Sequence, residues 1–377
     1  MEQVRNPDRD VVARLQRAIA DAGLNAVVAM SQDNATYALG VSVPSHRLIR
    51  ERRVAVLVPA EGPMAVVAVT VEESFLEAAL EEVEIRPYDE HTETAMQVLA
   101  RLLTEHRLAD ARIGLEMDFI AAEDYAELGG LLPRTAFSDA AGLFKRSRWI
   151  KTRREVERIR RGARMADEAI QEAFRVARPG MTERALATVM AGAFLRRGGD
   201  DIRLIVLGSG ERSSHPNAPP TDRALMRGDI VRADFLGTVG GYYTDCARTA
   251  VVGEPTDGQA ATYAAIAAIH REVLVRVRPG AHTRDLYDLY QMRAREHRLQ
   301  PLRFLGHGVG LGLHEGPFID GHTEVVLEPG MVFAIEPVHF VPHQVGFHLE
   351  DMLILTPEGH EVVTDVTATE ALWRIPA

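Results

Sequence analysis

The segment from Phe304 to Trp373 contains eleven carboxylates and seven of the fourteen histidines of the chain, but no lysine and no arginine. Its apolar runs are typical of buried strands, and a carboxylate buried among them needs a compensating positive charge. Because strong bases are absent here, that charge must come from arginines elsewhere in the chain, from protonated histidines or from a bound metal ion. The enrichment in histidine favours a metal.

Length and composition indicate an ordered protein of about two domains. The chain has 377 residues, of which 46% are hydrophobic and 26% charged, as in average globular proteins. Its formal charge of −11 and the lack of a clustered basic patch argue against nucleic-acid binding. No apolar run approaches the roughly 18 residues of a membrane span. The polar N-terminus and the single cysteine, Cys246, predict a cytoplasmic location.

The chain is predicted to divide into two domains, 1–147 and 148–377. The first alternates helical and strand patterns, as an α/β domain does; we expect helices at 10–22 and 95–106 and strands at 24–30, 53–59, 65–71 and 112–115. The stretch 145–154 holds both lysines of the protein and is expected to be an exposed linker. Within it, Thr152 and Glu155 form a capping-box pattern that begins a long amphipathic helix.

The second domain contains a weak internal repeat. The sequence RPGMT at 178–182 recurs about 100 residues later as RPGAHT at 278–283, each time between two helical patterns. Two related halves with an active site between them would explain this recurrence. Pro-Gly turns and threonine caps are also common at helix boundaries, so a chance resemblance of two helix–turn–helix units is the alternative.

A predicted hairpin at 230–252 carries two aspartates in apolar strands. A turn centred on Val239-Gly240 would place Asp234 directly opposite Asp245, with Cβ atoms about 5 Å apart, where like charges destabilise a sheet. A divalent cation between them would convert this repulsion into binding. The alternative for a single such residue is an ordinary aspartate at a strand end in water.

A second predicted hairpin, at 331–355, repeats the arrangement with glutamates. A three-residue turn centred on His343 places Glu336 opposite Glu350, and neither strand carries a lysine or an arginine. These two residues are therefore a second pair of facing carboxylates inside apolar strands.

The glycine-rich stretch 306–315 supplies the fifth candidate ligand. Glycine at every second position from 306 to 312 leaves one strand face without side chains, so that another group can approach closely. His307 and His314 are an odd number of residues apart and would point to opposite faces of a regular strand. One could bind a metal while the other serves elsewhere, and a structural role is the alternative for each.

Four carboxylates and one imidazole are a hard, oxygen-rich ligand set that suits two divalent ions. Two metals about 3.5–4 Å apart can share a bridging hydroxide and polarise a carbonyl. The residues therefore predict metal-assisted hydrolysis of an amide.

These motifs closely resemble those of the prolidase/aminopeptidase P family, the M24 or creatinase-like "pita-bread" metallopeptidases. The resemblance covers nearly the whole chain. It implies an α+β fold in which an N-terminal α/β creatinase-type domain precedes a C-terminal pita-bread catalytic domain with a pseudo-twofold repeat. It also implies Xaa-Pro dipeptidase or aminopeptidase activity on a small peptide or peptide-like amide, a homodimer, and two divalent ions per subunit, either Mn²⁺ or, as alternatives, Co²⁺ or Zn²⁺.

The resemblance also assigns roles to single residues. The implied metal ligands are Asp234, Asp245, His307, Glu336 and Glu350. Asp245 and Glu350 would bridge the ions, and Glu336 would be the general base for the bridging water that acts as nucleophile. His215, in SSHPNAPPTDR, resembles an upstream histidine that stabilises the intermediate or orients the substrate. His314 resembles a second histidine that contacts the substrate or shuttles a proton.

Three positions depart from the family pattern. Leu236 stands where glycine is usual, Arg303 where prolidases often have histidine, and His348 where arginine is usual. The last two lie in or near the substrate pocket by the resemblance, so they bear on Xaa-Pro specificity. Two alternatives stay open. One is a non-peptidase hydrolase or lyase that acts on a small metabolite, and the other is a binding pseudo-enzyme, which the intact ligand set disfavours.

Overall fold

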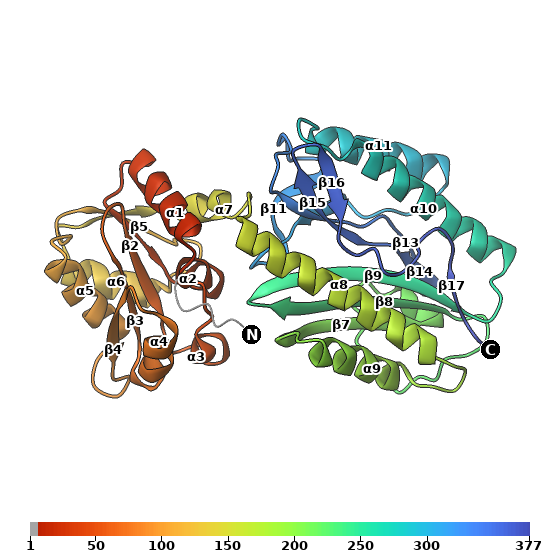
Figure 1. Cartoon of the computed structure of the whole chain (residues 1–377), viewed down its shortest axis with the longest axis horizontal. Coiled ribbons are helices and arrows are strands. Elements are labelled where there is room, and N and C mark those ends of the chain that lie inside the picture. The colour runs from red at the N-terminus through yellow and green to blue at the C-terminus, as the bar shows by residue number, and fades with distance from the viewer. Residues whose placement is uncertain (1–6) are drawn as a thin grey trace. The chain divides into compact units, whose positions relative to one another are not determined.

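The protein divides into two compact units, one up to Arg148 and one from Trp149 onward, in a computed structural model that describes residues 7–377 (Figure 1). Each unit has its own sheets and its own hydrophobic core. Among residues 7–377, no helix has both the length and the apolar character needed to cross a membrane.

The first unit is built on one six-stranded mixed sheet. In spatial order its strands are β4 (Val83–Tyr88), β3 (Met64–Val69), β2 (Ala55–Pro59), β1 (Ala26–Ala29), β5 (Arg112–Leu115) and β6 (Ala136–Asp139). Its helices are α1 (Arg9–Asp21), α2 (Gln32–Leu39), α3 (Pro44–Leu48), α4 (Glu73–Ala79), α5 (Ala95–Glu105), α6 (Ala122–Leu131) and α7 (Ala141–Ser147). Strands β1 to β3 are short, mainly aliphatic runs buried on both faces, as in a covered sheet. The helices and strands expected in this unit are confirmed to within two residues at each end.

The segment expected to be an exposed linker is exposed only in part. Its first three residues lie in α7 and include the exposed Lys145. In its C-terminal half, however, the Lys151 side chain is only 1% exposed, and its Nζ lies 3.4 Å from Glu315 Oε2. A buried carboxylate far along the chain thus draws this lysine inward. Thr152 and Glu155 form the expected capping box at the start of α8 (Arg153–Val176).

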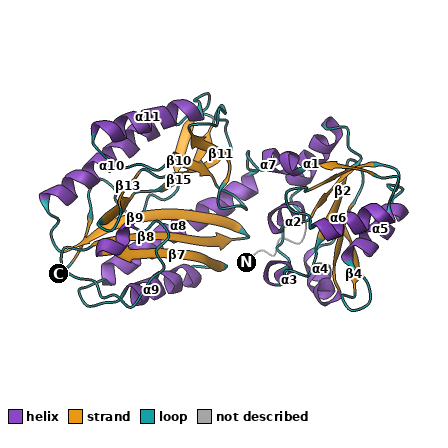
Figure 2. Cartoon of the chain, turned by 180° about the vertical axis from the view of Figure 1, so that it is seen from behind, coloured by secondary structure: helices purple, strands orange, loops and turns teal. Residues whose placement is uncertain are grey.

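The second unit combines two main sheets and a two-stranded ribbon with four helices (Figure 2). The four-stranded sheet has the order β17 (Trp373–Ile375), β9 (Tyr242–Val252), β8 (Ile230–Val239) and β7 (Asp201–Ser209). The five-stranded sheet has the order β11 (Glu315–Asp320), β10 (Phe304–Gly308), β12 (Val332–Ile335), β15 (Asp351–Thr356) and β16 (Gly359–Val362). The ribbon pairs β13 (Val338–Val341) with β14 (Val345–His348). Helices α8 and α9 (Glu183–Arg196) share a core with the first sheet, and α10 (Asp257–Arg276) and α11 (Thr283–Glu296) with the second.

The internal repeat is present in the backbone of the second unit. Gly180 and Gly280 adopt φ angles of +86° and +85°, which glycine reaches without steric cost. Their N–H groups donate to Leu225 O and Leu327 O, both at 2.9 Å. A helix follows each turn, α9 in the first copy and α11 in the second, and each copy then supplies one acidic strand pair, β8–β9 or β12–β15. The recurrence is therefore structural and not a chance match of turn residues.

Candidate metal centre

Asp234 and Asp245 lie on the hairpin β8–β9, but in a register that differs from the prediction. Asp234 pairs with Ala247, and Asp245 pairs with Leu236. The turn residues are Gly240 and Gly241, with φ angles of +59° and +83°, because a two-residue hairpin turn with two positive φ angles matches the twist of the strands. The predicted direct opposition is wrong. The shift of two positions nevertheless keeps both aspartates on one face, as diagonal neighbours.

The register predicted for the glutamates is confirmed. Val341 pairs with Val345 around the turn at His343, and Ile335 pairs with Asp351 farther along the same two chain segments. Glu336 and Glu350 therefore occupy equivalent positions between the two ladders. A break in regular pairing at this point leaves their side chains available for a ligand.

A backbone bridge joins the two acidic strand pairs beside the candidate ligands. The Glu350 N–H donates to Ala247 O at 3.1 Å, and the two residues form an isolated antiparallel bridge. Ala247 is also the register partner of Asp234 and lies two positions after Asp245. This bridge between the halves of the repeat helps to bring carboxylates from both together.

The two histidines lie side by side, contrary to the alternation expected for a strand. Their rings stack with centroids 3.9 Å apart and an interplanar angle of 26°. The reason is that only His307 lies in β10, which ends at Gly308, so His314 follows an irregular segment. A Cβ atom on Gly306 would lie 2.1 Å from Ala334 O. That glycine therefore admits a neighbouring strand, β12.

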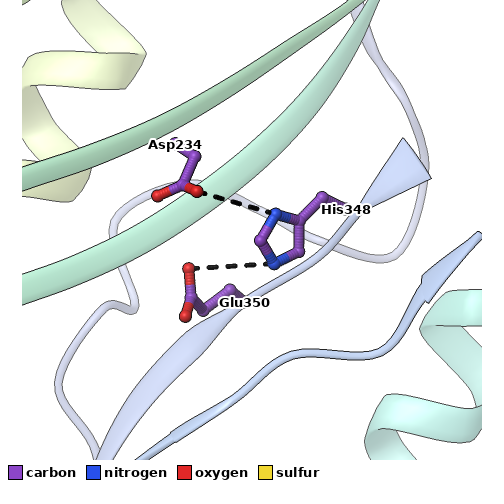
Figure 3. Close-up of side chains that lie close together, drawn as sticks. All are labelled: Asp234, His348 and Glu350. Atoms are coloured by element: carbon purple, nitrogen blue, oxygen red, sulfur yellow. Dashed lines mark ion pairs between the residues drawn. The ribbon is translucent and has the colours of Figure 1, made fainter. Parts of the chain in front are cut away.

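Histidine nitrogens and carboxylate oxygens approach one another closely in this cluster. His307 Nε2 lies 3.1 Å from Glu336 Oε1 and 3.6 Å from Asp245 Oδ2. His348 Nε2 lies 3.3 Å from Glu336 Oε2 and 3.9 Å from Glu350 Oε2. Figure 3 shows the His348 ring between Asp234 and Glu350, with Nδ1 4.0 Å from Asp234 Oδ2. The histidine that departs from the family pattern therefore belongs to the acidic cluster itself.

These side chains form two overlapping groups that could hold metal ions. One consists of Asp234, His348 and Glu350, and the other of Asp245, His307 and Glu350, each with ligand atoms within 4.8 Å of one another. Fully buried atoms in both groups lack a regular hydrogen bond, namely Asp234 Oδ1, Glu350 Oε2, His307 Nε2 and both ring nitrogens of His348. Buried polar atoms normally have partners. Short distances without hydrogen-bond alignment are what ligands arranged around a common ion would show, so the donor set fits a divalent metal.

The electrostatics of the cluster also favour a bound cation. Burial raises the pKa of Asp245 and Glu350 well above the usual range, and the neighbouring carboxylates raise it further. Burial likewise raises the pKa of Asp234. Burial would also raise the pKa of Glu336, but the two adjacent imidazoles outweigh it and lower this pKa to about 2. One carboxylate is thus firmly ionised, while ionisation of the other three is costly without a positive charge nearby.

A cavity of about 320 Å³ opens onto the cluster. Apolar side chains form much of its wall: Leu204, Val206, Leu236, Leu302, Phe304, Leu313 and Phe340. All five predicted ligands line this cavity, as do His314, His348 and Arg232. Its volume is at the small end of the range for ligand sites, about 300–1,000 Å³. The site therefore suits a small substrate with an apolar part.

Three positions singled out in the sequence differ in their relation to this cavity. Leu236 lines it, whereas Arg303 is exposed and is not one of its lining residues. His215 is also exposed and does not line it; its ring packs edge-on against His343, with centroids 6.1 Å apart. The role expected for His215 stays a prediction. Sequence reasoning missed Arg232, although its position two residues before Asp234 on a strand places both side chains on one face.

Comparison with known proteins identifies the class that this fold and site define. Residues 157–357 match metallopeptidase family M24, and residues 12–150 match the creatinase/prolidase N-terminal domain. The chain belongs to metallopeptidase family M24. It is an enzyme of this class, with the creatinase-type and pita-bread architecture that the resemblance implied.

Individual relatives agree with this assignment. The probable dipeptidase PepE of Mycobacterium tuberculosis is 30% identical over 364 residues, which cover 94% of this chain and 95% of that protein. The Xaa-Pro dipeptidase of Pyrococcus furiosus is 30% identical over 231 residues, 60% of this chain and 66% of that protein. The crystal structure of dipeptidase PepE from Mycobacterium ulcerans superposes with a TM-score of 0.82 at 27% identity and covers 98% of both chains.

Proposed function

We propose that the protein is a dinuclear metal-dependent peptidase that hydrolyses Xaa-Pro peptides, as a dipeptidase or as an aminopeptidase. The observation that carries this proposal is the pair of potential ligand groups that share Glu350. Two divalent ions held side by side supply Lewis acidity that polarises the scissile carbonyl and activates water. The names of the relatives, dipeptidase and Xaa-Pro dipeptidase, support the substrate class.

The proposed ligands are those that the family resemblance implies, with one addition. They are Asp234, Asp245, His307, Glu336 and Glu350, of which Asp245 and Glu350 would serve both ions by the resemblance. His348 would be a further nitrogen donor on the Asp234 side, where it forms one potential ligand group with Asp234 and Glu350. Mn²⁺ is the first choice of ion, and Co²⁺ or Zn²⁺ are alternatives. The nitrogen of His348 favours the later transition metals more than an all-oxygen site would.

Two residues are proposed to move protons. Glu336 lines the cavity, and the two adjacent imidazoles lower its pKa and keep its carboxylate ionised, so a carboxylate oxygen of this residue would be the acceptor for the proton of the attacking water. His314 lies at the exposed edge of the cavity. Burial, and then the neighbouring His307, lower its pKa. A neutral imidazole there can donate a hydrogen bond to the substrate or pass a proton toward the leaving amine.

Metal reconstitution with a peptide panel tests the proposal. The protein is stripped with a chelator and reloaded with Mn²⁺, Co²⁺ or Zn²⁺, and bound metal is counted by mass spectrometry. Hydrolysis of Ala-Pro and related dipeptides should return with about two ions per chain. The absence of both bound metal and restored hydrolysis would overturn the proposal. Metal binding without turnover of any peptide would instead favour the alternative, a non-peptidase hydrolase or lyase on the same scaffold.

We assign catalysis to residues 148–377 and regard 1–147 as the creatinase-like N-terminal domain. The homodimer and the cytoplasmic location stay predictions. Sedimentation of the purified protein would measure its oligomeric state directly.

A further inference from the structure

Arg232 is a buried arginine whose orientation is set by uncharged groups. The residue lies on β8 and is only 1% exposed. Its Nε donates to Ser213 O at 3.1 Å, and Nη2 donates to the carbonyl oxygens of His215 and Pro216. The guanidinium also stacks over Phe340, with Cζ 5.2 Å from the ring centroid. These contacts hold the group in one orientation but do not neutralise its charge.

The positive charge of Arg232 has no direct counter-ion. Within residues 7–377, no carboxylate oxygen lies within ion-pair distance, 4.0 Å, of its nitrogens. Nη1 donates no hydrogen bond to any described residue, and it is not one of the fully buried polar atoms. A buried charge without a partner is unfavourable. One donor of this guanidinium is therefore available to a ligand.

The cavity lining points to the kind of ligand. Among the described residues that line the cavity, Arg232 is the only arginine or lysine. Asp234, two positions farther along β8, lines the same space. In the metal-loaded enzyme, two divalent ions would balance the four carboxylates of the centre. Arg232 would then be the one arginine or lysine of the described lining, with no carboxylate in ion-pair contact, and the carboxylate of a substrate could pair with its free donor.

We propose that Arg232 binds the C-terminal carboxylate of the substrate and so makes the enzyme a dipeptidase rather than an aminopeptidase for longer chains. This inference rests on the proposed peptidase function. Neighbouring side chains on one face of a strand are about 7 Å apart. In a dipeptide the terminal carboxylate is one residue, less than 4 Å, beyond the scissile carbonyl. Charged pairs of this type bond at about 2.8 Å. With the scissile carbonyl at the proposed metal centre beside Asp234, these two lengths together span the distance to Arg232, so the terminal carboxylate would be within its reach.

Comparison of a dipeptide with its amide tests the proposal. With the Mn²⁺-loaded protein, kcat/KM for Ala-Pro should exceed that for Ala-Pro amide by about a hundredfold, because a charge-assisted hydrogen bond is lost in the amide. Arg232→Met should remove this preference, mainly through a higher KM for the dipeptide. Arg232→Lys keeps the charge but not the planar fork, so part of the preference should remain.

A matched control separates the lost carboxylate contact from general disturbance of the sheet. Arg203 on β7 is also largely buried and stacks over a ring, with Cζ 5.2 Å from the Tyr243 centroid, but it does not line the cavity. Arg203→Met should leave the preference for the free carboxylate intact. If Arg232→Met retained that preference, or if the wild type showed none, the proposal would be wrong.

A binding measurement separates this proposal from the proposed peptidase function. Calorimetry with L-proline and L-prolinamide on the metal-loaded protein requires no turnover. Tighter binding of proline by the wild type, lost in Arg232→Met at unchanged metal content and unchanged circular dichroism, would support the carboxylate contact even if no peptide were hydrolysed. Equal binding of both probes by the wild type would overturn it even if peptides were hydrolysed.

Discussion

The two copies of the repeat in the second unit share a backbone plan but differ in charge. The strands of the first copy, β8 and β9, contain Arg232 and Arg248 among their acidic residues, whereas the segment that contains β12 to β15 has no strong base. Arginines of the first copy form ion pairs with carboxylates of the second. Arg248 Nη2 lies 2.8 Å from Asp351 Oδ1 on β15, and Arg160 on α8 pairs with Glu361 on β16.

Two adjacent carboxylates of the second copy are therefore in different situations. Asp351 is bonded by Arg248 and by the Thr364 hydroxyl. Glu350, the preceding residue, has no lysine or arginine within ion-pair distance among the described residues, and its Oε2 has no hydrogen bond. An arginine of the first copy thus neutralises Asp351, whereas Glu350, the proposed metal ligand, receives no such charge.

The largest expected effect is on stability, from removal of the cation shared between the copies. Arg248→Met leaves Asp167 and Asp351 buried without their partner, so the free energy of unfolding should fall by about 3–5 kcal/mol. Urea denaturation of the metal-free protein measures it. Arg160→Met is the matched control, because the side chains of Arg160 and Glu361 are 36% and 40% exposed and such pairs contribute less than about 1 kcal/mol. Similar losses in both variants would contradict the comparison.

The next effect separates Glu350 from Asp351. Glu350→Gln removes the residue common to both potential metal groups. Activity should therefore fall a hundredfold or more, which corresponds to a rise of about 2.7 kcal/mol in the activation free energy. Such a loss exceeds the one typical of residues that only orient metal ligands. The metal-free protein should be no less stable at neutral pH, because burial and neighbouring carboxylates raise the pKa of Glu350 and make its ionisation unfavourable.

Asp351→Asn should show the opposite behaviour. It weakens the pair with Arg248 and should destabilise the metal-free protein while it keeps two ions per chain. Metal content and the free energy of unfolding in urea are measured for Glu350→Gln and Asp351→Asn. The exposed Glu358, changed to Gln, is the control. Full metal content in Glu350→Gln would refute its assignment as the shared ligand.

The smallest expected effect is a pH dependence at the same junction. His270 is buried with Nε2 3.5 Å from Asp351 Oδ2, and burial lowers its pKa below 6.5. The native state therefore favours the neutral ring, so this stabilisation is present above pH 6.5 and is lost as the pH falls below it. His270→Gln should flatten the decline in unfolding free energy by about 1 kcal/mol per pH unit in that range. Parallel pH profiles for both proteins would contradict this.

The sequence predicted the acidic centre well where local pattern decided the geometry. The alternation of side chains along strands placed both aspartates on one face, and a symmetric turn set the register of Glu336 and Glu350. The predictions from sequence were wrong where the backbone departs from regular strand geometry. The Gly240-Gly241 turn shifted the first register by two positions, and the irregular segment after β10 let His314 stack on His307.

By itself, the sequence indicated the family, the division into two units, several of the helices and strands, and the residue types of the proposed metal centre, because strand periodicity and turn chemistry are local properties. The tertiary structure alone decided which carboxylates receive an arginine and which, such as the proposed metal ligand Glu350, do not. Arg248 and Asp351 are 103 positions apart in the chain, so their pairing depends on how the two copies pack. Strand alternation places Arg232 and Asp234 on one face, but only the packing buries Arg232 beside the cavity with no carboxylate of the described residues within ion-pair distance.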